Sequence, residues 1–377
     1  MKFPLLFVII TALSVSVMAQ NSKNNEFFLM VGTYTNDQKT NGIHVYTFNV
    51  ETGDFAERSK ITDITNPSFL AVSKDRKNVY SVSEGGEGKG VNAYSFDAST
   101  GRLTFLNNGS AGGSGPCYIS VDDKKHTVFT GNYGGGSLSA TKLNADGSLT
   151  TNVQVIQHEG SSVNKGRQEK PHVHAVVLSP DNRYLMVPDL GTDKVNVYRY
   201  EDGKDKPLTP ASPPFATVTP GGGPRHLTFH PNGKYAYLIL EMQGAIAAFD
   251  YKNGTLTPKQ DFTMLAPGFT GKVGAADIHI SPDGKFLYGS NRGEANEIVI
   301  YSIGKDGKLT YAGRQSTLIN TPRNFAIDPT GNFLLAANQN SNDVVIFKRD
   351  KTSGLLTPTG KRIEVDKPVC LKFVSMK

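Results

Sequence analysis

The sequence predicts an all-β chain folded as a seven-bladed β-propeller, with four antiparallel strands in each blade. Three observations favour this fold class. The 377 residues include 39 glycines and 20 prolines, they show no long helical periodicity, and a strand–turn–strand unit returns about every 50 residues. Repetition at this period, with four short strands in each repeat, is typical of propeller blades.

The clearest copy of this unit runs from Gly223 to Glu241, with the sequence G-P-R-H-L-T-F-H-P-N-G-K-Y-A-Y-L-I-L-E. A short strand leads through the turn H-P-N-G into a second strand. Pro231 fixes φ and Gly233 tolerates positive φ, which such a turn requires. Because the two strands must be antiparallel, Arg225 and Glu241 are expected at the same end of the hairpin, away from the turn.

Five further copies of the unit occur along the chain, and they begin at Phe69, Tyr118, His174, Ile278 and Phe325. Aligning the six turns, at spacings of 49, 57, 51, 51 and 47 residues, places in register Ser73, Asp122, Ser179, His230, Ser281 and Asp328. The seventh blade must then combine strands from both ends of the chain, at 27–33, 43–49 and 369–374. Joining the N- and C-terminal strands in one blade closes the ring and removes exposed sheet edges.

Residues 1–19 have the pattern of a secretory signal peptide. Lys2 supplies the positive charge, an apolar run follows, and small or aliphatic residues precede a cut before Gln20. A membrane anchor is the alternative, but the apolar run is too short and no charged stop follows it. We therefore expect an exported, periplasmic protein with a single propeller domain at 20–377 and no membrane segment after cleavage. If the segment is not a signal, the protein is cytosolic.

The composition limits the classes of partner and chemistry. The net charge of +6 is scattered without a basic run, which favours a small anionic or sugar ligand over nucleic acid. Cys117 and Cys370 occupy similar strand positions in different blades, beyond bonding reach, so both are expected as free buried thiols. The sequence contains no G-x-S-x-G motif, which argues against a serine hydrolase of that type. It does not indicate an oligomeric state.

Two polar insertions interrupt the repeat, at 157–171 and at 201–222. Both are expected to be surface loops on the face where the first strands begin, where they would form part of a rim around a pocket. Ordinary variable connections are the alternative interpretation.

The blades differ from one another mainly at the end of the hairpin opposite the turn. If the first strand is innermost, the side chains at this end surround one mouth of the central channel. Those entering first strands or leaving second strands include His172, His174, Asp189, Arg225, His226, Glu241, Asp277, His279, Arg292, Arg323 and Asn338. A concave site rich in titratable groups is the default hypothesis for function.

A divalent metal is one possible occupant of this mouth. His172 and His174 lie two apart on a strand and share a face, as do Asp277 and His279, and these types of side chain bind metals. The spacing is weak evidence, and a metal-free site with a histidine base and arginines that bind an anion is simpler. We therefore expect no metal and no cofactor. The histidines could also be purely structural, and Arg225 with Glu241 could be an ion pair that braces neighbouring blades.

Several long motifs resemble those of a known family. They include P-H-V-H-A-V-V-L-S-P-D, G-G-G-P-R-H-L-T-F-H-P-N-G-K-Y-A-Y and P-R-N-F-A-I-D-P-T-G-N-F-L-L-A-A-N-Q. In order and content they are similar to the seven-bladed propeller lactonases, which include the bacterial propeller-type 6-phosphogluconolactonase and the fungal carboxymuconate lactonizing enzyme. The resemblance covers essentially the whole chain after residue 19.

This resemblance implies a lactonase, a carboxylic ester hydrolase that opens a sugar lactone to the aldonic acid in carbohydrate metabolism. The proposed active-site residues of the family fall on His174, Arg225, Glu241 and Arg292. The remaining mouth residues named above are then expected to bind substrate. Three features depart from the family: Leu240 stands where Asn commonly precedes the glutamate, Asp277 stands where Glu is often found, and the expected export differs from the cytosolic location of the phosphogluconolactone enzyme.

Two other functions fit the same mouth. One is a non-catalytic propeller that binds a carbohydrate or an acidic ligand. The other is a cycloisomerase that forms a lactone from an unsaturated diacid, for which two arginines are well suited. Turnover of lactones and of muconates separates these alternatives from the lactonase.

Overall fold

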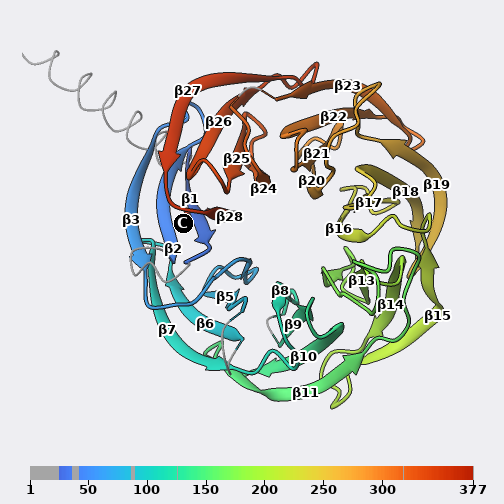
Figure 1. Cartoon of the computed structure of the whole chain (residues 1–377). Helices are drawn as coiled ribbons and strands as arrows, with labels where there is room; N and C mark the ends of the chain where they lie inside the picture. Colours follow the sequence, from blue (N-terminus) through green and yellow to red (C-terminus); the bar gives the residue numbers. More distant parts are fainter. Residues whose placement is uncertain (1–24, 36–41, 86–89, 125, 317, 377) are drawn as a thin grey trace, which may run out of the picture.

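The computed structural model describes residues 25–35, 42–85, 90–124, 126–316 and 318–376. Within these ranges, 28 strands form seven four-stranded antiparallel sheets, which stand as blades around a central channel (Figure 1). This is the seven-bladed β-propeller that the repeats predict. The predicted signal peptide, residues 1–19, lies outside the described residues. In the described part of the chain, no helix is long and apolar enough to span a bilayer.

Blades 1 to 6 follow one another along the chain, and the closing blade joins the two chain ends. In this order of blades, the first strands, which border the channel, are β4 (Leu70–Val72), β8 (Pro116–Val121), β12 (Val177–Leu178), β16 (Pro224–Phe229), β20 (Ala275–Ile280), β24 (Pro322–Ile327) and β28 (Pro368–Ser375). The second strands are β5 (Asn78–Val82), β9 (Thr127–Asn132), β13 (Tyr184–Asp189), β17 (Tyr235–Leu240), β21 (Phe286–Asn291), β25 (Phe333–Asn338) and β1 (Glu26–Thr33).

The third and fourth strands complete each blade towards the outside of the ring (Figure 1). The third strands are β6 (Val91–Asp97), β10 (Ser137–Leu143), β14 (Lys194–Tyr200), β18 (Ala245–Lys252), β22 (Glu297–Ile303), β26 (Asp343–Arg349) and β2 (Ile43–Asn49). The fourth strands are β7 (Arg102–Gly109), β11 (Leu149–Gln157), β15 (Leu208–Thr217), β19 (Thr255–Thr263), β23 (Leu309–Gln315), β27 (Leu356–Glu364) and β3 (Phe55–Ile61).

The burial of each strand follows from its place in the blade. Every residue of β21 and β25 is buried, because neighbouring blades cover both faces of the inner strands, and such strands become continuous apolar runs. Fourth strands alternate between exposed and covered residues, as in β27. In the closing blade, β28 pairs with β1 from Phe27↔Ser375 to Gly32↔Cys370, so the last strand of the chain completes the ring.

The prediction of a surface loop across 201–222 is wrong in its central part. Residues Leu208–Thr217 form β15, the fourth strand of blade 3, in spite of their prolines. β15 is the outermost strand of its sheet and pairs with β14 alone. An edge strand tolerates proline because N–H groups on its outer side have no ladder partner to bond.

The turns that aligned the repeats have a structural explanation. In blade 5, the Ser281 hydroxyl donates to Asp283 Oδ1 at 2.5 Å and accepts the Phe286 N–H at 3.0 Å. The same arrangement holds in blade 3, where Ser179 donates to Asp181. The Ser-x-Asp pattern therefore fixes the hairpin between first and second strands, at the end away from the mouth.

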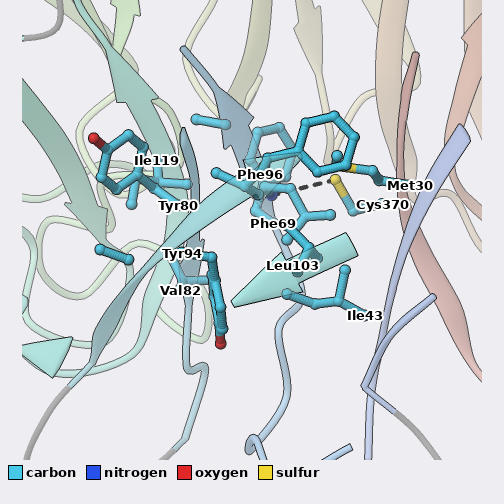
Figure 2. Packing of buried hydrophobic residues seen from close by; sticks show 14 of the residues in the cluster. Met30, Ile43, Phe69, Tyr80, Val82, Tyr94, Phe96, Leu103, Ile119 and Cys370 are labelled. Atoms are coloured by element: carbon cyan, nitrogen blue, oxygen red, sulfur yellow. Dashed lines mark hydrogen bonds between the residues drawn. The ribbon is translucent and has the colours of Figure 1, made fainter. Parts of the chain in front are cut away.

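Both cysteines are buried and free, as the propeller geometry predicts. Cys370 belongs to a hydrophobic cluster between the closing blade and blade 1 that includes Met30, Phe69 and Tyr80 (Figure 2). Its sulfur accepts the Leu70 N–H at 3.4 Å. Cys117 lies instead beside the mouth of the channel, below the site described next.

Tyrosines on second strands connect neighbouring blades, and this leads to a first prediction. The Tyr288 hydroxyl in blade 5 donates to the Gly354 carbonyl of blade 6 at 2.7 Å and accepts from Arg349 Nε at 2.7 Å. Tyr288→Phe leaves two buried polar groups without this partner, so we expect the free energy of unfolding to fall by about 1–3 kcal/mol. Urea denaturation measures this, and Tyr311→Phe, at a half-exposed tyrosine, is the control. Equal stability of the two variants would contradict the prediction.

Candidate active site

Two positions in each blade supply most of the side chains at the mouth. Five residues before the aligned turn residue stand Ser68, Cys117, His174, Arg225, Ala276 and Arg323, and eleven residues after it stand Glu84, Tyr133, Leu190, Glu241, Arg292 and Gln339. In the closing blade, Gly32 pairs with Cys370 as Gly131 pairs with Tyr118, so Tyr34 occupies the second position. The repeat therefore brings residues that are far apart in sequence to one end of the channel.

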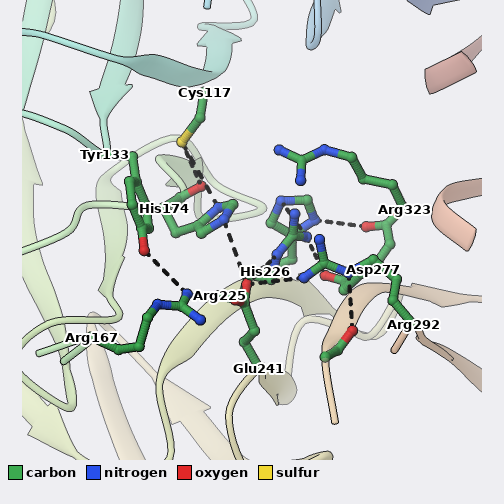
Figure 3. Close-up of polar contacts among 12 residues, drawn as sticks. Cys117, Tyr133, Arg167, His174, Arg225, His226, Glu241, Asp277, Arg292 and Arg323 are labelled. Atoms are coloured by element: carbon green, nitrogen blue, oxygen red, sulfur yellow. Dashed lines mark hydrogen bonds and ion pairs between the residues drawn. The ribbon is translucent and has the colours of Figure 1, made fainter. Parts of the chain in front are cut away.

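Glu241 is the centre of this group (Figure 3). Its Oε2 lies 3.0 Å from Arg225 Nε and 3.2 Å from Arg292 Nη2, and its Oε1 accepts from Arg167 Nη2 at 2.8 Å. The pairing of Arg225 with Glu241 is the one that the antiparallel hairpin predicts. Three guanidinium groups thus surround one carboxylate.

This charge arrangement determines the ionisation of Glu241. Burial raises the pKa of the carboxyl, but Arg292, Arg225 and Arg167 together outweigh burial and lower that pKa to about 2. Glu241 is therefore a carboxylate at any physiological pH. Because its oxygens are already bonded and its pKa is low, it accepts a proton poorly and instead holds the arginines in place.

The two arginines of neighbouring blades differ in accessibility. Arg225 is buried, and its Nη1 donates to His226 Nε2 at 3.2 Å and to the Ala276 carbonyl. Arg292 donates through Nε to the Gly274 carbonyl at 3.0 Å, and its side chain keeps 17% exposure. Arg292 can therefore contact a ligand at the mouth, whereas Arg225 supports Glu241 from below.

His174 lies between Glu241 and Cys117. Its Nε2 is 3.9 Å from Glu241 Oε2, and its Nδ1 is 3.8 Å from the Cys117 sulfur. Burial, followed by Arg225, His226 and Arg323, holds the pKa of His174 well below its usual value. A neutral imidazole beside a carboxylate and an arginine has the composition of a site for general base catalysis.

A second polar layer lies under Arg225. Asp277 accepts from His226 Nδ1 at 2.7 Å and lies 2.9 Å from His279 Nε2, and it also accepts the Asn324 amide and the Phe325 N–H. Asp277 and His226 are thus hydrogen-bonded to each other, and both are buried. Their geometry fits positioning of Arg225 better than the contact with substrate that the sequence predicts, while His279 remains partly exposed.

The two buried histidines lead to a second prediction. The pKa of His226 is lowered to about 3, first by burial and then by Arg225, and that of His174 is also lowered. In the unfolded chain both titrate near 6.5, so below pH 6.5 the unfolded state binds more protons and folding stability falls as the pH decreases. For His226 we expect a loss of roughly 2 kcal/mol at pH 5, and His174 adds a loss of the same sign.

Urea denaturation between pH 5 and 8 tests this expectation. His226→Gln should show a smaller decrease in unfolding free energy than the wild type between pH 6.5 and 5, because one of the two groups no longer titrates. Unchanged stability of the wild type over this interval would contradict the prediction.

Asp189 and Asn338, two of the predicted mouth residues, lie outside the group around Glu241. Asp189 is fully buried and accepts from His158 Nδ1 at 2.7 Å and from the His172 N–H at 2.8 Å. Asn338 donates to the Leu318 carbonyl and to Asp343. Both stand one residue before the mouth position, and alternate side chains on a strand point to opposite faces. Their contacts give no support to the predicted substrate-binding role.

His172 also has local partners. Its ring stacks on Tyr133 at 4.5 Å, its Nδ1 lies 3.0 Å from the Tyr133 carbonyl oxygen, and its Nε2 lies 3.2 Å from Glu169 Oε1. The metal site considered from His172, His174, Asp277 and His279 is not assembled. Within the described ranges, the one set of three ligands close enough for a metal is Asp122, His126 and Asp202, at the opposite end of the hairpins.

Two contributors to the site were not assigned from the sequence. Arg167 comes from the insertion at 157–171, and its Nη2 also donates to the Tyr133 hydroxyl at 3.2 Å. The insertion does therefore form part of the rim. Tyr133 could have been found, since it shares the blade position of Glu241. Arg167 carries no such signal, because the insertion has no counterpart in other blades.

The fold and site together define a class: a seven-bladed propeller whose channel mouth carries a carboxylate held by arginines beside a neutral histidine. The family described as lactonase, 7-bladed beta-propeller, matches residues 28–373. The chain belongs to this family.

Individual relatives agree with this assignment. The chain is 36% identical over 347 residues to a 6-phosphogluconolactonase of Bacillus subtilis, covering 91% of this chain and 97% of the relative. It is 38% identical over 343 residues to a 6-phosphogluconolactonase of Formosa agariphila, covering 90% and 97%. The solved structure of a periplasmic gluconolactonase from Pseudomonas aeruginosa superposes with a TM-score of 0.89 at 39% identity, covering 93% of this chain and all of the other.

Proposed function

We propose that this protein hydrolyses an unphosphorylated sugar lactone to the open-chain aldonic acid, in the periplasm. The observation that carries the proposal is the group of His174, Glu241 and Arg292 at the mouth of a propeller of the lactonase family. The Pseudomonas aeruginosa relative is a periplasmic gluconolactonase, and residues 1–19 have the pattern of a secretory signal. Both support a substrate found outside the cytosol. Sugar phosphates are scarce in that location, which favours an unphosphorylated lactone.

In the proposed reaction, His174 is the general base. It takes a proton from a water molecule that attacks the lactone carbonyl carbon, and Arg292 stabilises the oxyanion that forms. The bond between this carbon and the ring oxygen then breaks, and the proton returns from His174 to the ring oxygen, which becomes the hydroxyl of the acid. Glu241 is less suited to be the base because its pKa is about 2, and its role is to orient Arg225 and Arg292 and to stabilise the charged imidazolium.

Hydrolysis of a small panel in a pH-stat tests this proposal. The panel contains glucono-1,5-lactone, its 6-phosphate, and galactono- and rhamnono-lactones, each corrected for spontaneous opening. We expect turnover of unphosphorylated lactones that is lost in His174→Gln. Turnover of the phosphorylated lactone alone would contradict the proposed substrate and location. No turnover above background would contradict the lactonase function.

A further inference from the structure

A second carboxylate stands at the mouth, in blade 1. Glu84 occupies the same position in its blade as Glu241 does in blade 4. Its Oε2 accepts from the Tyr34 hydroxyl at 2.9 Å and from the Ser68 hydroxyl at 2.5 Å, and Arg323 Nη2 lies 3.8 Å away. These contacts orient the carboxylate while 27% of its side chain stays exposed.

A hollow of about 420 Å³ opens beside Glu84. It lies between blade 6, the closing blade and blade 1, and its lining is formed by Tyr34, Asn66, Glu84, Gly85, Gln339 and Lys367. These side chains include a carboxylate, amides, an ammonium group and a phenol. The volume is within the range of ligand pockets, and such a lining suits a polar ligand.

The backbone around this hollow is strained. Asn66, Thr321 and Lys367, which enter the first strands of these three blades, have φ of 40°, 53° and 46°. Residues other than glycine rarely adopt this left-handed backbone conformation, and they keep it only where surrounding contacts hold them. Asn66 shows such contacts: it accepts the Thr35 N–H at 2.8 Å and donates to the Glu84 carbonyl at 2.9 Å.

Arg323 connects this hollow to the group around Glu241. Its guanidinium lies over the Tyr34 ring, 5.3 Å from the ring centroid. The same group lowers the pKa of His174 and of Arg225, so its charge also acts at the reacting end of the site. Arg323 and Glu84 also occupy the blade positions of Arg225 and Glu241, so the hollow beside Glu84 lies at the same mouth of the channel as His174 and Arg292.

We propose that the hollow beside Glu84 is a subsite for a neutral glycosyl group attached to the lactone. The inference rests on the lactonase function proposed above and specifies its substrate class. The Glu84 carboxylate accepts hydrogen bonds from sugar hydroxyls, while Gln339 and Lys367 supply donors. A further sugar ring is uncharged and fits the volume, whereas a phosphate would face the Glu84 carboxylate as well as the Lys367 ammonium group.

The test compares two lactones in the full-length protein. Glucono-1,5-lactone and its 4-O-glucosyl derivative are hydrolysed by the wild type, by Glu84→Gln and by Gln339→Ala, with Glu51→Gln in an exposed turn as a matched control. We expect the wild-type KM to be roughly tenfold lower for the glucosyl lactone, as for one hydrogen bond to a charged group. The ratio of the KM for glucono-1,5-lactone to the KM for the glucosyl lactone should fall towards one in Glu84→Gln. Gln339→Ala should also lower this ratio, whereas Glu51→Gln should leave it unchanged.

Other outcomes overturn the proposal. Equal KM values for the two lactones in the wild type, or a change in Glu84→Gln that is equal for both, would show that no glycosyl group binds there. A lower KM of Glu84→Gln for the 6-phosphate would place a phosphate in the hollow instead. If the protein hydrolyses no lactone, calorimetry still tests the subsite separately from the reaction. Tighter binding of the glucosyl-gluconate than of gluconate, lost in Glu84→Gln, supports it, and equal binding does not.

Discussion

Replacing Glu241 with glutamine is expected to lower kcat/KM for lactone hydrolysis by about 100- to 1,000-fold and the free energy of unfolding by about 3–5 kcal/mol. Glu241 is the shared partner of Arg225, Arg292 and Arg167. Without its charge, the buried Arg225 loses its ionic partner, which is costly in a site removed from water. Arg292 loses the contact that fixes its guanidinium, so the oxyanion is stabilised less well.

Glu297→Gln is the matched control for this prediction. Glu297 is also a buried carboxylate and accepts from Arg314 Nη1 at 2.7 Å, but it belongs to the third strand β22, further from the channel than the hairpin that precedes Arg292. We expect it to lower stability without lowering kcat/KM per folded protein. Urea denaturation and initial rates on the same samples separate the two effects. If both variants lose activity alike, Glu241 acts through stability alone, and the role proposed for it in the reaction is contradicted.

His174→Gln is expected to lower kcat by about 100- to 10,000-fold with a small change in KM, since a positioned general base contributes this factor. Glutamine keeps much of the volume of the side chain but cannot take a proton from water. The lowered pKa of His174 also predicts how the activity of the wild type depends on pH. Because this pKa lies well below 6.5, the kcat/KM of the wild type should show no decrease near pH 6.5, where an exposed histidine would titrate.

His44→Gln serves as the control for His174→Gln. His44 is a buried histidine of β2 in the closing blade, and its partner is Glu57 of the adjacent strand. This variant should keep the wild-type kcat and the wild-type pH profile. An acidic limb near pH 6.5 in the wild type, or full activity of His174→Gln, would remove His174 from the role of base and leave Glu241 as the remaining candidate.

The fold could be predicted in detail because the repeat reports both strands and their order. The turn residues of six blades align, and the ends of the chain supply the seventh, where β1, β2 and β28 fall within one residue of the ranges expected. The pairing of Arg225 with Glu241 followed from the same reasoning, since an antiparallel hairpin brings its ends together.

The sequence did not indicate how deeply each predicted side chain is buried or in which direction it points. Asp189 and Asn338 were expected at the mouth, but each stands one residue before the position that faces it, and a single residue reverses the direction of a side chain on a strand. His226 and Asp277 lie at the correct end of the channel but below Arg225. Their burial depends on contacts between different blades, such as the hydrogen bond that the Asn324 amide donates to Asp277, which no pattern within one repeat records.

The closing blade has a consequence for how the protein is made. Its first strand, β28, is the last of the described strands along the sequence, whereas its other three strands, β1 to β3, are the first. The ring therefore cannot close until β28 has been synthesised. A chain that stops before residue 368 keeps the edge of β1 unpaired, and such an edge is prone to pair with other chains. The closed ring thus depends on the strand that is synthesised after all the others.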